Sequence, residues 1–196
     1  MKDITFICSA IISGTSMVAK VCMDHGAWFG TTEDSSSMIY DVYENARFRQ
    51  LCRNALGIDK DLRGQNLFQL FQEFFEGLPE NEKIVLKYPK SFYLLDDFKK
   101  IIGSDFKVVY VMRNPFMRAI SIQKKNGGNI IPNYLVDWND TYTYMAQHTR
   151  GTDVYTVIYE RFFLEPGIEA KKLLDFIGLK YDKIDVSGID SSKRHF

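Results

Sequence analysis

The stretch that decides the fold is ITFICSAIISGTSMVAKVCMDHGAWFG, residues 4–30. Its first five residues are apolar or nearly so, which is typical of a central parallel strand that is covered on both faces. Small residues follow over residues 9–14, and a helical pattern begins at Thr15. The stretch therefore predicts a buried strand, a tight turn and a helix in direct succession.

The turn of this unit has the composition of an anion site. Ser13, Gly14, Thr15 and Ser16 leave backbone N–H groups open at a helix N-terminus, where the helix dipole also favours negative charge. A phosphate-loop NTPase needs a Lys directly after its second Gly, and Thr15 holds that place here. The turn thus predicts a phosphate site of another kind, and an ordinary turn without a ligand is the alternative.

Composition sets outer limits on function. The chain has 196 residues, which favours one domain over 1–196, and its 25 Lys and Arg balance 25 Asp and Glu. A neutral chain without a long apolar run predicts neither nucleic acid nor membrane as a partner. Cys8, Cys22 and Cys52 lack metal-ligand spacing, so no metal is expected. An odd cysteine count without a targeting segment favours the cytoplasm.

Three more strands are expected at residues 83–88, 107–112 and 153–159, of which KVVYVM at 107–112 is the richest in β-branched residues. Expected helices alternate with them at 38–56, 65–77, 91–102 with Ser91 as N-cap, 116–125, 134–148 and 166–177. Strands alternating with helices predict an α/β fold, a three-layer sandwich whose central parallel sheet has helices on both faces.

Ligands of open parallel sheets bind beyond the carboxyl ends of the strands. Lys87 and Lys90 follow one predicted strand, Arg113 follows the next, and Tyr159 and Glu160 follow the last. Cations therefore gather at one edge of a sheet in a chain that is neutral as a whole, which suits a ligand with several phosphates.

The segment RNPFMRAIS, residues 113–121, can grip one phosphate from two sides. Arg113 lies at a strand end and Ser121 lies about two helical turns further on, so the two can act together. The alternative is a surface arginine that pairs with a carboxylate and a helix serine that faces water.

RNPFMRAIS after KVVYVM resembles the 3′-phosphate-binding segment of sulfotransferases that use 3′-phosphoadenosine 5′-phosphosulfate (PAPS). The SGTS turn is similar to the family's 5′-phosphosulfate loop, LKYPKSFYLL at 86–95 to its K-x-P segment, and VIYERFFLEPGIEAKKLLDFIGL at 157–179 to its Y-E-D-L segment and following helix. The four segments occur in the family's order over nearly the whole chain. They are closest to carbohydrate-type, tyrosine-type and bacterial members, and they imply a fold like that of P-loop nucleotide hydrolases.

The resemblance implies roles for individual residues. Ser13, Gly14, Thr15 and Ser16 would cradle the 5′-phosphosulfate, and Arg113 and Ser121 would hold the 3′-phosphate of PAPS or of its product PAP. Tyr159 would lie against the adenine, and Arg194, with Lys193, corresponds to basic residues near the family's C-terminus that help bind the 3′-phosphate. The alternative for Tyr159 is an aromatic side chain of the core, and the alternative for Lys193 and Arg194 is a frayed tail.

The chain departs from the family at Ile12, where a Lys or Arg usually stabilises the leaving group. Lys87 is the expected substitute, and Lys20, about two turns down the helix, is a poorer one. The acceptor's proton needs a base, which we expect to be Glu33 in the polar loop 31–37, with Asp34 next. A solvated loop carboxylate is the alternative there, and His25 is expected to be structural.

The sequence as a whole predicts a compact sulfotransferase that moves a sulfuryl group from PAPS to a hydroxyl or amine of a small-molecule or carbohydrate acceptor. A sulfotransferase-like module that has lost catalysis is the alternative that Ile12 favours. A small-molecule kinase is disfavoured, because the phosphate-loop Lys is missing and no later strand ends in a clear metal-binding Asp. The acceptor and the oligomeric state stay open.

Overall fold

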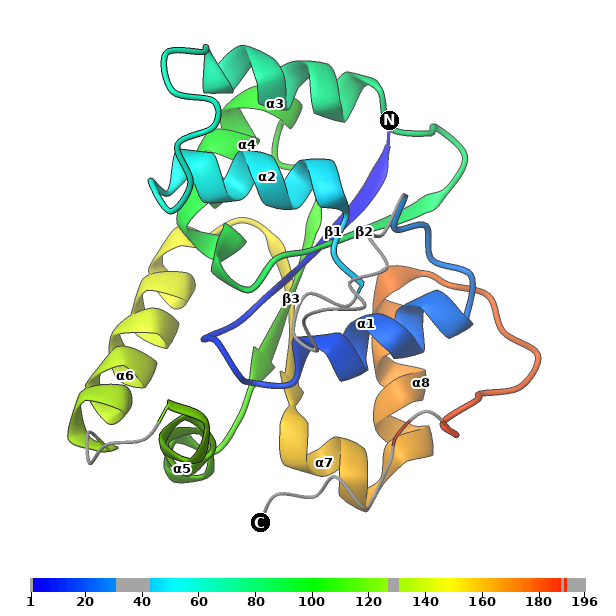
Figure 1. Cartoon of the computed structure of the whole chain (residues 1–196). Coiled ribbons are helices and arrows are strands. Elements are labelled where there is room, and N and C mark those ends of the chain that lie inside the picture. The colour runs from blue at the N-terminus through cyan, green and yellow to red at the C-terminus, as the bar shows by residue number, and fades with distance from the viewer. Residues whose placement is uncertain (1, 31–42, 127–130, 188, 190–196) are drawn as a thin grey trace.

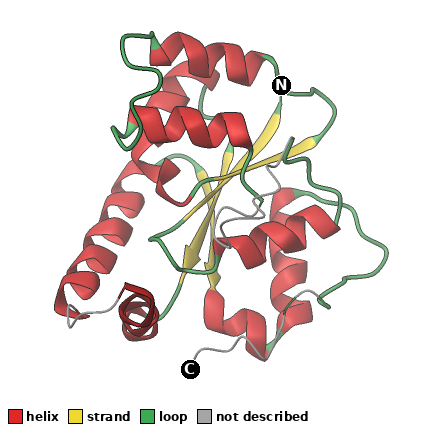
Figure 2. Ribbon diagram, viewed as in Figure 1, coloured by secondary structure: helices red, strands yellow, loops and turns green. Residues whose placement is uncertain are grey.

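A computed structural model describes residues 2–30, 43–126, 131–187 and 189. Its centre is a parallel sheet of four strands in the order β2-β1-β3-β4. These strands are β1 (Asp3–Cys8), β2 (Lys83–Lys87), β3 (Lys107–Met112) and β4 (Asp153–Ile158). Figure 2 shows the sheet in the middle of the molecule with helices on either side. The predicted three-layer α/β fold is confirmed.

The strands form because their side chains are buried on both faces. In β1 the side chains of Phe6 and Cys8 enter one core, and that of Ile7 enters the other. Val108 and Val109 of β3 divide in the same way, as successive strand residues must. A strand with two buried faces needs a nearly continuous apolar run, which is why β1 and β3 are readable in the sequence.

Two helical layers cover the sheet (Figure 1). One layer holds α2 (Ala46–Ala55), α3 (Leu67–Glu76), the 3₁₀ helix η1 (Pro89–Leu94), α4 (Leu95–Ile102) and α6 (Ile131–His148). The other holds α1 (Thr15–Asp24), α7 (Tyr159–Leu164) and α8 (Pro166–Ile177), while α5 (Pro115–Asn126) packs against α6. Stacked phenylalanines fill the first core, with the rings of Phe6 and Phe98 5.0 Å apart.

The order of the strands places a topological switch point between β1 and β3. The chain runs from β1 outward to β2, then returns to β3 on the other side of β1 and continues to β4. The connections after β1 and β3 therefore lead to helices on opposite faces, α1 and the α5–α6 pair. Such a switch point leaves a gap between adjacent loops, and ligands of open α/β sheets bind there.

Some boundaries differ from those predicted. The helix expected over 38–56 is α2, which begins at Ala46 because the Asn45 side chain accepts a hydrogen bond from the Phe48 N–H and caps it. Tyr43 before it has φ 66° and is not helical, and residues 31–42 lie outside the described part of the chain. The prediction of Ser91 as a helix N-cap is wrong, since Ser91 is buried inside η1 and donates to the Tyr88 carbonyl.

Two further boundaries differ from those predicted. Tyr159, expected as the last residue of a strand, is the first residue of α7, a short helix that the sequence analysis missed. The helix expected over 134–148 begins at Ile131. Beyond these elements, Trp28 forms a parallel bridge with Ile84 along the outer edge of β2.

Candidate functional site

The loop between β1 and α1 has the geometry of an anion-binding turn. Its last residue, Gly14, has φ 93° and is the N-cap of α1, where no side chain caps the first amides. The first turn of α1 also contains no acidic residue. Unopposed N–H groups and the positive end of the helix dipole thus lie at the carboxyl end of β1. Ser13 and Thr15 are buried in the turn, and Ser16 is half-buried.

Gly14 is required by its neighbour as well as by its backbone. A Cβ atom built at Gly14 would lie 2.2 Å from two ring carbons of Tyr159, which is impossible without movement. The Tyr159 ring therefore lies directly against the turn, at the start of α7. Burial raises the pKa of Tyr159, although the neighbouring Arg113 acts in the opposite direction.

Arg113 brings a cation to the same place from the end of β3. Its side chain is buried, and its guanidinium carbon lies 4.8 Å from the centre of the Tyr159 ring. Its Nη1 donates to the Ile12 carbonyl at 3.4 Å. Asn114 then caps α5, since its Oδ1 accepts from the N–H groups of Phe116 and Met117. Arg113 is thus in direct contact with the turn between β1 and α1, which lies more than 90 residues away in sequence.

Ser121 lies on the second turn of α5 and is half-buried. The helix begins at Pro115, as the sequence predicts, so Arg113 and Ser121 belong to one strand–helix unit. That unit adjoins the turn after β1, because β1 and β3 are neighbours in the sheet.

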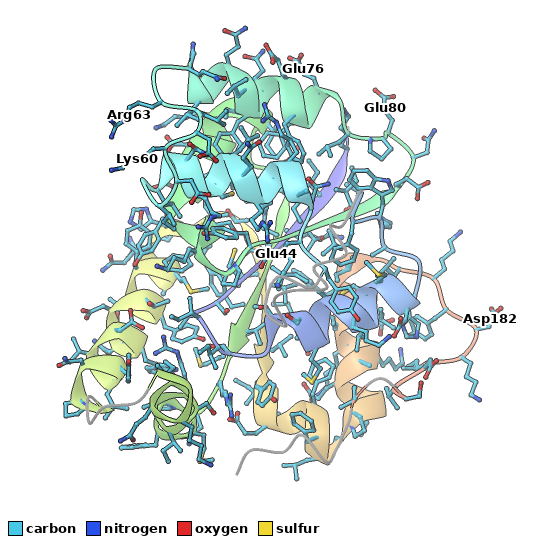
Figure 3. All side chains as sticks on the ribbon, in the orientation of Figure 1. Glu44, Lys60, Arg63, Glu76, Glu80 and Asp182 are labelled. Atoms are coloured by element: carbon cyan, nitrogen blue, oxygen red, sulfur yellow. The ribbon has the colours of Figure 1, made fainter. Side chains whose placement is uncertain are left out.

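Lys87 places a second cation at the turn, from the last position of β2. Its side chain is 1% exposed, its Nζ lies 2.8 Å from Glu44 Oε1, and it donates to Ser16 Oγ at 3.3 Å. Glu44 is itself 3% exposed. Figure 3 shows Glu44 near the middle of the molecule, whereas Lys60, Arg63 and Asp182 lie at its periphery. Charged groups this deeply buried are stable only when they are paired.

Glu44 is the site residue that sequence reasoning missed. It directly precedes the cap of α2, and the longer helix expected there placed it on an ordinary helix surface. Nothing in the neighbouring sequence indicates a partner, because Lys87 follows 43 residues later. The contact exists only because the start of α2 lies over the end of β2.

Other predicted residues are placed as follows. Lys20 pairs with Asp24 at 2.8 Å on the exposed side of α1, away from a role in the turn. His25 is structural, with Nδ1 2.7 Å from the Val21 carbonyl and Nε2 accepting from the Asp185 N–H. Glu33, Asp34, Lys193 and Arg194 lie outside the described residues. Within the described part of the chain, no group of three or more His, Cys, Asp or Glu is arranged to hold a metal ion.

The fold and the site define a class of protein: an α/β protein with a parallel sheet, in which buried cations and an uncapped helix N-terminus gather at the carboxyl ends of the strands. Residues 5–183 match the model of a protein family described as the sulfotransferase family. The match covers most of the chain, and the chain therefore belongs to the sulfotransferase family. No curated protein matches the sequence.

Solved structures share the fold at low sequence identity. The sulfotransferase domain from the curacin biosynthetic pathway is 14% identical with a TM-score of 0.63, over 97% of this chain and 78% of that one. The sulfotransferase domain of the Synechococcus PCC 7002 olefin synthase gives the same identity and TM-score, over 97% and 79%. Mouse sulfotransferase SULT7A1, solved with PAP, is 16% identical with a TM-score of 0.58, over 93% and 61%. No helix in the described residues is long and apolar enough to span a membrane.

Proposed function

We propose that the site binds PAPS and transfers its sulfuryl group to a hydroxyl or amine of a small-molecule or carbohydrate acceptor. The observation that carries this proposal is the buried Lys87, whose ammonium contacts both Glu44 and Ser16. It supplies a cation at the first turn of α1, where the family usually has a basic loop residue and this chain has Ile12. The mouse relative that was solved with PAP supports the choice of donor.

The residues present suit both phosphate ends of such a donor. The amides at the start of α1, with Ser13 and Ser16, suit the 5′-phosphosulfate. Arg113 and Ser121 suit the 3′-phosphate, since a guanidinium forms paired hydrogen bonds with phosphate oxygens. The Tyr159 ring, held between Gly14 and Arg113, offers an aromatic face for the adenine. Arg194 stays a prediction for the 3′-phosphate.

When bound, the donor supplies a sulfuryl group that is already activated by its link to phosphate. The acceptor oxygen or nitrogen bonds to sulfur as the bond from sulfur to the bridging phosphate oxygen breaks, and the acceptor gives up a proton. Negative charge then grows on the leaving phosphate, where Lys87 and the amides of α1 stabilise it. A general base must take the proton.

We propose Glu44 as a second candidate for this base, beside Glu33. Its carboxylate lies 2.8 Å from Lys87, so protonation of Glu44 would remove the negative partner of that ammonium. The full charge of Lys87 would then act on the leaving phosphate at the moment when charge develops there. This coupling of proton uptake to leaving-group stabilisation supports Glu44. Glu33 rests on the family resemblance.

We propose that the reaction takes place in a reducing compartment, and the state of the cysteines supports this. Cys8, Cys22 and Cys52 are all free and buried, which fits a reducing compartment such as the cytoplasm. The proposal involves no nucleic acid or membrane partner, and it leaves the oligomeric state open.

Calorimetric titration with PAP, with ATP as the comparison ligand, tests the donor site. We expect PAP to bind far more tightly than ATP, and Arg113→Ala to weaken PAP binding by about 10–100-fold, because a charged hydrogen-bonding partner is lost. Lys60→Ala is the control, since it removes an exposed cation at the periphery of the molecule. Failure of the wild-type protein to bind PAP would overturn the proposal and favour a catalytically impaired module. Magnesium-dependent ATP turnover would instead favour a kinase.

Transfer of labelled sulfate from PAPS to a panel of hydroxyl and amine acceptors tests the chemistry. If Glu44 is the base, Glu44→Gln lowers the transfer rate by about 10²–10⁴-fold, while PAP affinity does not fall, because the charge of Lys87 is no longer offset by the carboxylate. Glu33→Gln is the matched variant, and the larger loss identifies the base. Equal, small effects of both substitutions would exclude both residues.

A further inference from the structure

Arg118 connects α6 to the turn between β1 and α1, residues 9–14. We call this segment the 5′ turn, because the proposed function assigns it to the 5′-phosphosulfate. The proposed chemistry gives Arg118 no role. It is one of the largest fully buried side chains, at 0% exposure. Its Nε donates to the Ile11 carbonyl at 2.8 Å, and its Nη1 donates to the Tyr134 carbonyl at 3.0 Å. Its Nη2 lies 2.5 Å from Asp137 Oδ2. One guanidinium thus holds the backbone of the turn and two points on α6.

The same helix is attached to the end of β3. The indole Nε1 of Trp138 donates to the Arg113 carbonyl at 2.9 Å. The Tyr142 hydroxyl donates to the Val111 carbonyl at 2.7 Å, and it lies 3.5 Å from Ser13 Oγ in the 5′ turn. Three consecutive turns of α6 therefore contact both segments that the proposed function assigns to the two phosphate ends of the donor.

The backbone of the 5′ turn needs such support. Ile12 is β-branched and yet has φ 62°, a left-handed conformation that such residues rarely adopt. The carbonyls of Ile11 and Ile12 on successive residues are held by Arg118 and Arg113 respectively. Strained backbone persists at functional sites only where surrounding contacts fix it, and here two arginines do so.

We propose that Arg118, anchored on Asp137, is a positioning residue that fixes the spacing between the 5′ turn and the 3′-phosphate segment. The inference rests on the proposed function, since it concerns the same nucleotide site. A ligand with two phosphate ends gains affinity when both subsites are held at the matching distance, because its second end then binds intramolecularly. A ligand with one phosphate end gains nothing from that spacing.

The test compares ligands as well as variants. Binding of PAP, adenosine 5′-monophosphate and adenosine 3′-monophosphate is measured by calorimetry, with competition against PAP for the weak ligands. In Asp137→Asn we expect PAP affinity to fall about tenfold while each monophosphate changes less than about threefold. Asp137 is 54% exposed, so this variant removes the anchor without emptying the core. Asp140→Asn, an exposed carboxylate on the same helix, is the control and leaves all three affinities unchanged.

Arg118→Lys, at the buried end, is the second variant. A lysine keeps the charge but cannot reach three acceptors in the planar arrangement of a guanidinium, so we expect the same selective loss for PAP. Equal losses for all three ligands would mean a general folding defect and would overturn the inference. Unchanged PAP affinity in both variants would overturn it as well. Absence of PAP binding in the wild-type protein would instead refute the proposed function.

Discussion

The buried pair of Lys87 and Glu44 gives a sharp stability prediction. The two side chains are 1% and 3% exposed and their charged atoms are 2.8 Å apart. Removal of one partner leaves the other charge in the interior without this ion pair, which typically costs about 3–5 kcal/mol. Glu44→Gln and Lys87→Met should each lower the free energy of unfolding by that amount. For a chain of this length, the melting temperature should fall by about 6–20 °C.

The double variant separates the pair from the individual side chains. With both charges removed nothing is left unpaired, so Glu44→Gln with Lys87→Met should be more stable than the sum of the single effects predicts, by at least about 2 kcal/mol. Equilibrium unfolding in urea measures all three variants at one pH. The control is Asp24→Asn, which breaks the exposed pair with Lys20 and should cost less than about 1 kcal/mol. Strictly additive losses, or a cost below about 1 kcal/mol for Glu44→Gln, would refute the reasoning.

Three further predictions concern the turn and the core. Gly14→Ala should destabilise the protein by about 1–3 kcal/mol more than Gly26→Ala in thermal unfolding. Both glycines have positive φ, but only a Cβ at Gly14 meets the Tyr159 ring. Equal effects would contradict that contact. Ile12→Asn should raise the free energy of unfolding, measured by urea denaturation, by about 1 kcal/mol, since Asn tolerates the left-handed conformation. A lower free energy of unfolding would mean that the apolar side chain of Ile12 contributes more than the backbone strain costs. Burial raises the pKa of Cys8 to about 12, and it also raises the pKa of Cys22 and of Cys52. Iodoacetamide at pH 8 should therefore label the native protein far more slowly than the urea-unfolded protein. Rapid labelling of the native protein would show that a thiol is accessible.

The sheet and half of the site were readable in the sequence because local patterns determine them. Strands buried on both faces require continuous apolar runs, and β1 and β3 have them. Arg113 follows such a run directly, so the end of the strand fixes its position. The turn before α1 was recognisable for the same reason, since small residues between an apolar run and a helical pattern have few other uses.

Contacts between distant segments were not readable. Glu44 was missed because its partner lies on a distant strand. Arg118 lies within RNPFMRAIS and received no role of its own, although its three acceptors lie on the 5′ turn and on α6. The start of α2 was misplaced for a related reason. The apolar spacing over 38–56 begins several residues before Asn45, which caps the helix. Periodicity alone does not show which polar side chain accepts a hydrogen bond from the backbone and so starts the helix.

Ile12 removes a basic side chain from the 5′ turn, but the arrangement of the neighbouring charges makes that loss less costly than the sequence suggests. A lysine on a turn is flexible and hydrated, and it loses side-chain entropy when it orders against a phosphate. Lys87 projects from the end of β2, is almost fully buried, and is already held by Glu44 and Ser16. Its charge is therefore oriented before any ligand binds, which is the condition under which a cation stabilises developing charge most effectively. The turn itself is held by Arg113 and Arg118 through its backbone, so its shape does not depend on a basic side chain at position 12.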